Sequence, residues 1–583
     1  MTDDNSDKKV ATELMKLVKN VQHMRLLLLS ATPMYNSYKE VIWLLNLLNI
    51  NDGRASISVK DVFNSDGSFK MTDDGEEIGK NLLIRKATGY VSFVRGENPY
   101  TYPFRVWPNE FAEKKNISKG HVPKVQMNGM AIISGLEHLS VFLCDTGAVQ
   151  QKGYDYIIDQ LKKDVGKDPT RSMPSFENMD GFGYTILQRP LEALNIVYPD
   201  SRLGNSEFDP KELVGKSGLS RITKFRESKA PIFRGDFEYR TLEYGNIFSP
   251  EKIGLYSGKI DNICKSIIGS DGVILIYSQY IDGGLVPIAL ALESMGMRRA
   301  EYPSLFKVQQ AETIDAVTYK PVSKMLPGEK FSPASYVMIT GDKAFSPDNV
   351  ADLKRCTNLD NKNGEKVKVI LISQAGSEGL DFKFIRQVHI LEPWYNMNRV
   401  EQIIGRAVRT CSHKDLPFLL RNVQLFLYGS VMSRPNEEAA DLYVYRLAEL
   451  KSVQIGLVSR ALKESAVDCI LNVDQTLFTQ DKMKTIVKQK LSTGKLIDYA
   501  VGDRPYTSTC DYMKSCSYKC MPDTKGYDKI ILDTYGESFI MLNNDKIIKR
   551  IRDSFKERFF YKKDRLIGEI NAVKTSRYSI SFN

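Results

Sequence analysis

The sequence has no apolar run long enough to cross a membrane. Its longest candidates, residues 21–29 and 41–50, are shorter than the roughly 18 residues that a membrane-spanning helix needs. The first nine residues are acidic and polar, which is unlike a secretory signal. We therefore expect a protein that is not secreted and has no membrane partner.

Cysteine is scarce, with eight residues scattered over 583. At that density, and without a signal, we expect reduced thiols in a cytosol-like compartment. Cys510, Cys516 and Cys520 have spacings near those of small metal sites, but structural zinc usually needs four ligands and no fourth lies nearby in the sequence. Zinc is therefore the weaker alternative to free thiols at these three positions, and no other metal site is predicted.

The sequence also lacks both motifs by which phosphate-loop enzymes hold ATP and Mg²⁺. No G-x-x-x-x-G-K-[ST] phosphate loop occurs, and no D-E-x-[HD] follows an apolar run. The nearest match, Gly215-Lys216-Ser217, has Pro210 where the first glycine belongs, and no predicted buried strand leads into it. We therefore expect the chain alone not to hydrolyse ATP.

The overall composition is that of a large globular protein. Its 583 residues are too many for one core and favour several structural units. Hydrophobic residues make up 42% and charged residues 26% of the chain. The net charge of +10 permits a polyanion partner, although a solvated lysine-rich surface has the same composition.

Apolar runs alternate with helical patterns between residues 251 and 430. Short runs without polar interruption predict strands that are buried on both faces. Such strands alternating with helices predict an α/β fold with a doubly wound parallel sheet. The strands are expected at Val273–Tyr277, Tyr336–Ile339, Val367–Ile372 and Val388–Leu391, and the helices at Ile260–Ile268, Gly284–Met295 and Asn398–Arg409.

Three further parts are expected around this sheet. Residues 1–50 predict two helices with a buried strand at Leu26–Leu29 between them. Residues 51–250 are interpreted as a mixed α+β insertion, in which the second half shows no clear pattern. Residues 431–583 are expected to be mostly helical and basic.

The end of the chain combines positive charge with aromatic residues. Residues 546–563 carry many lysines and arginines, and Phe560 and Tyr561 lie among them. The apolar residues at helical spacing are Ile548, Ile551, Phe555 and Phe559. A face that binds nucleic acid and a solvated helix that packs this stripe on a core explain the pattern equally well.

Gln402, Arg406 and Arg409 follow one another at offsets of four and three, which places them on one face of a helix. Gly405 removes a side chain where another backbone or a ligand can approach. Two guanidiniums on a rigid element suit the charge of a phosphoryl group during transfer. The alternative is an exposed basic helix with surface ion pairs.

Two turns after predicted strands are further candidate sites. Gly376, Gly379 and Asp381 follow one strand, and α/β sheets bind ligands at such carboxyl ends. The amides and the carboxylate suit a sugar or a phosphate, whereas an ordinary tight turn is the alternative. Ser30 and Thr32 follow another strand and offer two hydroxyls that can relay hydrogen bonds, and helix capping is the alternative there.

In their order along the chain, these segments resemble the motifs of superfamily 2 helicases. The similar segments are Ser30–Thr32 for motif III, Val273–Gln279 for motif IV, Gly376–Asp381 for motif V and Gln402–Arg409 for motif VI. The order and the strand context make the joint match specific. The resemblance implies a RecA-like second lobe at 251–430 and a remnant of the first lobe at 1–50.

Longer stretches resemble helicases of nucleocytoplasmic large DNA viruses, including relatives of the poxvirus early transcription factor small subunit and Swi/Snf-like viral helicases. These stretches are 26–36, 89–99, 391–399, 461–469 and 503–506. The resemblance implies an ATP-dependent helicase or translocase in viral transcription. It also implies a location in the virion or the host cytoplasm, and viral RNA polymerase as a candidate partner.

The resemblance also implies roles for individual residues. Arg406 and Arg409 would neutralise the phosphates of ATP, and Gln402 would sense them. The residues expected to couple the nucleotide to movement are Gly376, Gly379, Asp381, Gly405, Ser30 and Thr32, and those expected to contact DNA or RNA are Ser278, Gln279, Thr340 and Gly341. In the family, ATP and Mg²⁺ are held mainly by a first lobe upstream of motif III. We therefore expect this chain to be the downstream part of a split gene, a truncated product or a fragment.

Two other hypotheses stay open. A non-catalytic, transcription-factor-like subunit that binds DNA or RNA polymerase is favoured by the missing phosphate loop. It is disfavoured by the two aligned guanidiniums, which a structural lobe does not need. A degenerate fragment without function is favoured only by the point at which the sequence starts.

Overall fold

The computed structural model describes residues 9–21, 23–118, 122–167, 173–174, 184–203, 208–229, 232–374, 379–434, 436–521 and 537–571. The chain divides into two units, residues 1–521 and 522–583. Gly376 of the predicted turn lies outside the described residues.

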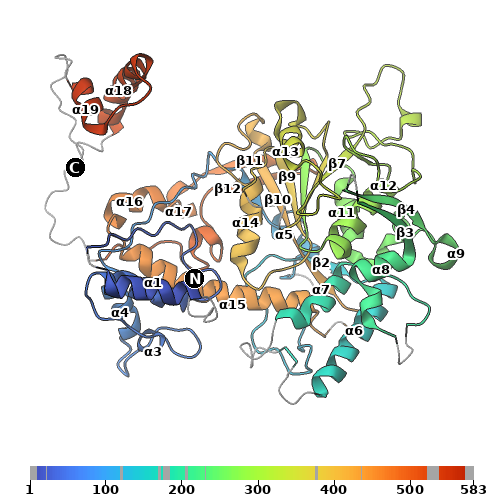
Figure 1. Cartoon of the computed structure of the whole chain (residues 1–583), viewed down its shortest axis with the longest axis horizontal. Coiled ribbons are helices and arrows are strands. Elements are labelled where there is room, and N and C mark those ends of the chain that lie inside the picture. The colour runs from blue at the N-terminus through green and yellow to red at the C-terminus, as the bar shows by residue number, and fades with distance from the viewer. Residues whose placement is uncertain are drawn as a thin grey trace. The chain divides into compact units, whose positions relative to one another are not determined.

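A parallel sheet of eight strands organises unit 1 (Figure 1). The strand order is β1-β10-β9-β5-β8-β7-β6, and β2 also pairs with β10. Every pairing in this sheet is parallel. The strands are β1 (Phe104–Val106), β2 (Phe142–Asp145), β5 (Val273–Tyr277), β6 (Arg298–Arg299), β7 (Ser335–Ile339), β8 (Val369–Ile372), β9 (Ile385–Ile390) and β10 (Asn422–Val431). The predicted α/β fold with a parallel sheet is confirmed.

Both faces of the sheet are buried under helices. Ile274 and Ile276 of β5 pack in one core with α11 and α12, whereas Val273 and Leu275 pack in a second core with α13, α14 and α15. Every residue of β5, β7 and β8 is buried, which explains why these strands lack alternating polar residues. The helices are α11 (Gly258–Ile267), α12 (Val286–Ser294), α13 (Asn349–Thr357), α14 (Met397–Ala407) and α15 (Ala440–Glu464).

Two short strands from the first half of the chain extend the sheet beyond β10. β1 pairs with residues 422–424 and β2 pairs with residues 428–431. Ile196, Tyr198 and Leu219 lie in the same core as Ile274. Residues that the sequence assigned to an insertion thus share the sheet and its core. The helices of this part are α5 (Pro108–Phe111), α6 (Ala148–Gly166), α7 (Gln188–Asn195), α8 (Gly215–Ile222), α9 (Thr241–Tyr244) and α10 (Ile253–Tyr256), and its hairpin consists of β3 (Thr223–Lys229) and β4 (Ile232–Tyr239).

The first residues pack on the far half of α15. Met34 and Leu45 share a core with Val458 of that helix. The predicted strand at Leu26–Leu29 does not form, because its backbone pairs with no strand of the described residues. Leu27 and Leu29 are 80% and 87% exposed, whereas Leu26 packs against a core that includes Trp43. The helices here are α1 (Lys9–Asn20), α2 (Glu40–Asn51), α3 (Val59–Val62) and α4 (Ile78–Ala87).

The last part of unit 1 is less helical than predicted. An antiparallel hairpin of β11 (Ile486–Lys490) and β12 (Leu496–Ala500) follows α16 (Cys469–Thr476) and α17 (Gln480–Met483). Unit 2 contains α18 (Glu537–Glu557) and α19 (Lys563–Asn571).

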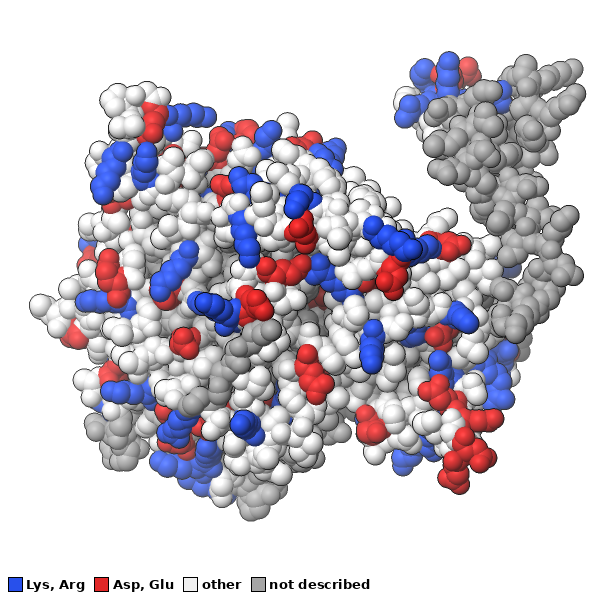
Figure 2. All heavy atoms as spheres, turned by 180° about the vertical axis from the view of Figure 1, so that it is seen from behind, with Lys and Arg blue, Asp and Glu red and all other residues white. Residues whose placement is uncertain are grey.

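The surface of unit 1 shows charges of both signs. Figure 2 shows lysines and arginines interspersed with acidic residues over most of the visible face. The positive net charge is thus not gathered into one large patch on that face. Among the helices of the described residues, none has the length and apolar character needed to cross a membrane.

Candidate functional site

The carboxyl ends of four adjacent strands bring the residues that follow them to one edge of the sheet. The order β9-β5-β8-β7 puts Leu391, Ser278, Ser373 and Thr340, which follow these strands, in neighbouring positions. The ladder continues into this edge, since Ser278 N–H donates a hydrogen bond to Ile372 O. Loops at the carboxyl ends of parallel strands are where doubly wound sheets bind ligands. We call these strand ends the carboxyl edge.

Helix α14 starts at this edge and carries most of the predicted arginine motif. Asn396 caps the helix, because its side chain accepts a hydrogen bond from Arg399 N–H at 3.2 Å. Gln402 is exposed, as expected for the face that points away from the sheet. The residues buried against the core are Met397, Arg399, Val400, Ile403, Ile404 and Ala407. The helix ends at Ala407, so Arg409 lies in the turn after it and the predicted end was too late.

Arg406 and Arg409 both contact the segment that follows Gly379. Nη1 of Arg406 donates to Leu380 O at 3.3 Å, and Phe382 N–H donates to Arg406 O at 3.0 Å. Nη1 of Arg409 lies 3.0 Å from Oδ1 of Asp381. The structure thus brings Arg409 to the predicted aspartate and Arg406 to the residues on either side of it. Both partners of this ion pair remain about half exposed, which keeps them within reach of a ligand.

The two predicted glycines near these arginines have open surroundings. Gly379 adopts a φ of +73°, in the left-handed region that favours glycine. No described atom lies within 4 Å of the place where a Cβ of Gly379 or Gly405 would be. The described structure therefore leaves space at both positions.

A buried carboxylate holds the loop after β5. Oε2 of Glu392 accepts hydrogen bonds from Ser278 Oγ at 3.1 Å and from Asn195 Nδ2 at 2.9 Å, and Gln279 N–H donates to Oε1. Burial raises the pKa of Glu392 to about 7, although these donors and Lys259 oppose the rise. Ser278 is itself buried. Its hydroxyl therefore shapes the loop, and Gln279 is the more accessible of the two predicted contacts.

The loop after β7 is also held by a buried hydroxyl. Thr340 is buried, and its hydroxyl lies 2.6 Å from Ser346 Oγ and donates to Asp342 O at 3.1 Å. Gly341 is exposed. In both loops a buried hydroxyl fixes the turn and the next residue lies closer to the surface.

The turn at Ser30 and Thr32 leads into a segment that docks on α14. Thr32 N–H donates to Ser30 Oγ at 3.0 Å, which closes the turn locally. Nδ2 of Asn398 donates to the carbonyls of Met34 at 3.0 Å and Tyr35 at 2.8 Å. Arg406 lies about 12 Å further along the same helix, at 1.5 Å per residue, and Arg409 lies just beyond the end of the helix. Helix α14 thus contacts the segment after the first motif at one end and the Asp381 segment at the other.

Three supporting side chains were given no role by the sequence patterns. Glu392 holds the β5 loop and Asn398 holds the segment at residues 34–35. Arg399 is 8% exposed, and its Nε and Nη2 have no partner among the described residues. All three lie within 391–399, a stretch that only the resemblance marked as part of a functional site.

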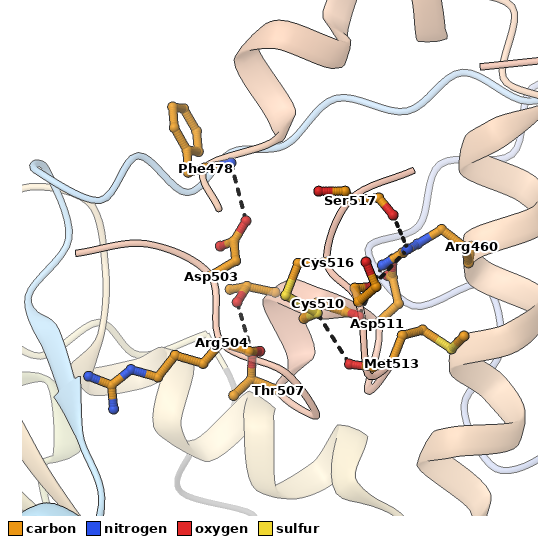
Figure 3. The surroundings of a disulfide bond; sticks show 12 residues. Arg460, Phe478, Asp503, Arg504, Thr507, Cys510, Asp511, Met513, Cys516 and Ser517 are labelled. Atoms are coloured by element: carbon orange, nitrogen blue, oxygen red, sulfur yellow. Dashed lines mark hydrogen bonds and ion pairs between the residues drawn. A yellow bond between two sulfur atoms is a disulfide. The ribbon is translucent and has the colours of Figure 1, made fainter. Parts of the chain in front are cut away.

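The cysteines differ from the prediction. Cys510 and Cys516 form a disulfide (Figure 3), and Cys469 and Cys520 form another. The predicted reduced thiols and the weak zinc alternative at these positions are therefore wrong, because each sulfur is bonded to another sulfur. Within the described ranges, no group of three or more His, Cys, Asp or Glu residues could hold a metal ion. The free thiols are Cys144, Cys264 and Cys356, which are buried, and Cys411, which is exposed.

Residues 309–411 match the helicase conserved C-terminal domain. A protein of Acanthamoeba polyphaga mimivirus that is named as an ATP-dependent RNA helicase is 24% identical over 94% of this chain and 47% of its own length. A second mimivirus protein with the same description is 38% identical over 80% of this chain and 56% of its own length.

The chain is related to the superfamily 2 helicases of large DNA viruses.

Two further proteins are similar over shorter spans. The termination factor NPH-I homolog of African swine fever virus is 28% identical over 37% of this chain and 33% of its own length. The crystal structure of the C-terminal part of the Fun30 ATPase domain shares 12% identity at a TM-score of 0.30, covering 59% of this chain and 99% of that one. The chain spans about half the length of the two mimivirus proteins.

The matched helicase domain contains the centre of the candidate site. Strands β7, β8 and β9, helix α14 and both predicted arginines lie within residues 309–411. The matched domain does not include Ser278, Gln279 or the turn at Ser30. The roles expected for these residues therefore depend on their position at or near the carboxyl edge.

Proposed function

We propose that this chain acts as the second lobe of an ATP-driven motor that moves on DNA or RNA. The observation that carries the proposal is the meeting of Arg406 and Arg409 with the Asp381 segment. Guanidiniums that are held in place stabilise the charge of a transferring phosphoryl group, and an arginine finger contributes about 10³ to 10⁵ in rate. Helix α14 holds Arg406, and the ion pair with Asp381 holds Arg409. Gln402 lies one turn before Arg406 on the exposed side and would contact the γ-phosphate.

The other predicted residues would couple the nucleotide to movement. Asp381 and Gly379 would contact the ribose or the nucleic-acid strand, together with Gly376 of the same predicted turn. The space beside Gly405 would admit the ligand or the other lobe. Ser30 and Thr32 would transmit the state of the nucleotide through the docked segment that follows them.

A first RecA-like lobe would complete the site. Leu27 and Leu29 are exposed in an extended, unpaired segment, and such a segment is a template for pairing with another sheet. The residues that follow are anchored, because Asn398 binds residues 34–35 and Lys451 Nζ donates to Asn36 Oδ1 at 2.9 Å. The segment that follows the leucines is thus held on α14 and α15. In this arrangement the first lobe would bind most of the ATP and Mg²⁺, and the arginines would reach the phosphates from this chain.

Nucleic acid would lie across the loops after β5 and β7. The hydroxyls of Ser278 and Thr340 are engaged inside these loops, so contacts would come from Gln279, Gly341 and the neighbouring backbone. Contacts of this kind bind phosphates and sugars and carry little sequence information. We therefore expect weak sequence preference on either DNA or RNA.

A role in viral transcription is part of the proposal. It is supported by the similarity to a protein named as a termination factor homolog of a large DNA virus. Viral RNA polymerase would then be a partner, and the chain would work in the virion or in the cytoplasm of the infected cell.

ATP turnover tests the proposal. The chain, a RecA-like first lobe with a phosphate loop, and the two combined are each measured with and without nucleic acid. We expect turnover by the combination that increases with nucleic acid, and none by this chain alone. Nucleic-acid binding without turnover in the combination would instead favour a non-catalytic subunit.

A further inference from the structure

Unit 2 forms a helical hairpin whose turn is fixed to its first helix. Nη1 of Arg550 in α18 donates to Ile570 O in α19 at 3.1 Å. The hydroxyl of Tyr561 donates to Ser554 O at 2.9 Å, and its ring meets the ring of Phe555 edge-on at 5.3 Å. Tyr561 therefore holds the turn between the helices in a defined position.

The two residues before Tyr561 point their rings into solvent. Phe559 is 99% exposed and Phe560 is 82% exposed. Neighbouring aromatic side chains on a surface usually mark an interaction site, because water contact is unfavourable for both rings. We call residues 558–563 the hairpin tip.

Positive charge surrounds the tip. Arg558 precedes the two phenylalanines, and Lys562 and Lys563 follow Tyr561. Residues 547–570 contain eight lysines and arginines against four aspartates and glutamates, an excess of four out of the net charge of +10. The basic residues are Lys549, Arg550, Arg552, Lys556, Arg558, Lys562, Lys563 and Arg565, and the acidic residues are Asp553, Glu557, Asp564 and Glu569. Figure 2 shows lysines and arginines prominent in the described part of this unit.

We propose that the hairpin tip binds single-stranded nucleic acid. Phe559 and Phe560 would stack on unpaired bases, and the flanking cations would bind the adjacent phosphates. A duplex does not fit as well, because its bases are already stacked on one another. This inference rests on the proposed function in one respect, because both assume that the negatively charged partner of the chain is nucleic acid.

The local structure favours nucleic acid over an anionic membrane. A helix that lies in a membrane surface exposes a long apolar face. Here Ile570 is buried and Ile551 is half-buried. Ile548 and Phe555 are 37% and 43% exposed, well below the two phenylalanines of the tip, so the strongest apolar exposure is at the tip. Acidic residues also lie between the basic ones along both helices. They weaken the attraction of the helices to a flat anionic surface, whereas the tip itself contains no acidic residue that would repel a nucleic-acid strand.

Fluorescence anisotropy of the full chain with a labelled oligothymidine tests the inference. The variant Phe559→Leu/Phe560→Leu keeps the apolar bulk but removes the ring faces, and we expect its Kd to rise about 10- to 100-fold. Lys562→Gln/Lys563→Gln should reduce the slope of log Kd against log salt by about 1.4, at about 0.7 per phosphate contact. The matched control is Lys324→Gln/Lys330→Gln, two exposed lysines that precede β7 in unit 1, away from the carboxyl edge.

The outcomes separate this inference from the proposed function. Binding by the parent chain that is unchanged in the leucine variant overturns the stacking site and leaves the motor proposal standing. Equal affinity for a duplex of the same length also overturns it. Binding to phosphatidylserine vesicles but to no oligonucleotide assigns the tip to membranes and contradicts both proposals.

Discussion

Arg409 and Asp381 form an ion pair, with Nη1 of the arginine 3.0 Å from Oδ1 of the aspartate. The pair joins the turn after α14 to the segment after β8, two places that lie 28 residues apart in the sequence. Because both partners are about half exposed, the pair is expected to add only about 0–1 kcal/mol to stability. A guanidinium carries several more donors, so one bond to Asp381 orients the group and leaves others for a phosphate.

The first prediction concerns this orientation. Asp381→Asn is expected to lower ATP turnover of the chain combined with a first lobe about tenfold, since Arg409 loses its charged partner. Its melting temperature should stay close to that of the parent chain. The control is Asp498→Asn in β12, where an aspartate of similar exposure pairs with Lys488 at 2.7 Å. Equal effects of the two variants on turnover would contradict an orienting role.

The second prediction concerns the buried carboxylate of Glu392. Its pKa is raised from the ordinary 4.5 to about 7, so the protonated form is favoured in the folded chain. Below its ordinary pKa, Glu392 is protonated in both the folded and the unfolded chain, and the stability of the fold is not reduced. That stability is lost as the pH rises through about 7, where the buried carboxyl must ionise. The side chain of Glu392→Gln stays neutral, like the protonated carboxyl. The free energy of unfolding of this variant, relative to that of the parent, should therefore rise by on the order of 3 kcal/mol between about pH 5 and about pH 8.

Urea unfolding of the two chains at both pH values measures this difference. The comparison cancels other groups that titrate in the same range, such as Asp352, whose pKa is raised to about 6 by burial. Glu312→Gln serves as a control, because that glutamate is exposed and accepts a hydrogen bond from Ser323 N–H. A constant difference between parent and Glu392→Gln at both pH values would show that the carboxylate does not titrate in this way.

The third prediction concerns the unpaired leucines. Leu27→Ser/Leu29→Ser should change the free energy of unfolding of this chain by less than about 0.5 kcal/mol, because both side chains are already exposed. Association with a first lobe should weaken more than tenfold, since burying each leucine is worth about 1.5–3 kcal/mol. Leu45→Ala, at a residue that is 3% exposed, should instead destabilise the chain by about 2–5 kcal/mol. Unchanged association would remove the leucines from the proposed interface.

The sequence predicted the centre of the fold better than its edges and its site contacts. β5 forms at the predicted residues because a continuous apolar run buried on both faces is a strong local signal. β1 and β2 were not predicted, because strands of three or four residues at a sheet edge have too few side chains to show a period. The end of α14 was placed too late, since no Gly or Pro marks Ala407 as its last residue.

The supporting contacts of the site depend on residues far apart in the chain. The carboxylate of Glu392 meets Asn195, Ser278 and Gln279, and no local pattern predicts such a meeting. The leucine run at 26–29 shows the converse case. Its unbroken apolar composition predicts a strand, but a strand also needs a neighbour, which the described part of the chain does not supply.

The fourth prediction concerns the two disulfides. In the loop-closure description, a cross-link over 51 residues stabilises more than one over 6, by about 4 against about 2.5 kcal/mol. Cys469→Ser/Cys520→Ser should therefore lower the free energy of unfolding more than Cys510→Ser/Cys516→Ser. Thiol titration of the oxidised chain gives an independent check, with four reactive thiols after denaturation and eight after reduction. Eight thiols before reduction would contradict both disulfides.

The most direct test of the motor proposal is the ATP turnover of Arg406→Ala and Arg409→Ala, each combined with a first lobe and nucleic acid. Each substitution is expected to lower the turnover number by about 10³-fold or more while the affinity for nucleic acid stays unchanged. Turnover within about tenfold of the parent for both variants, with the fold intact, would contradict the claim that these guanidiniums act on the phosphates of ATP.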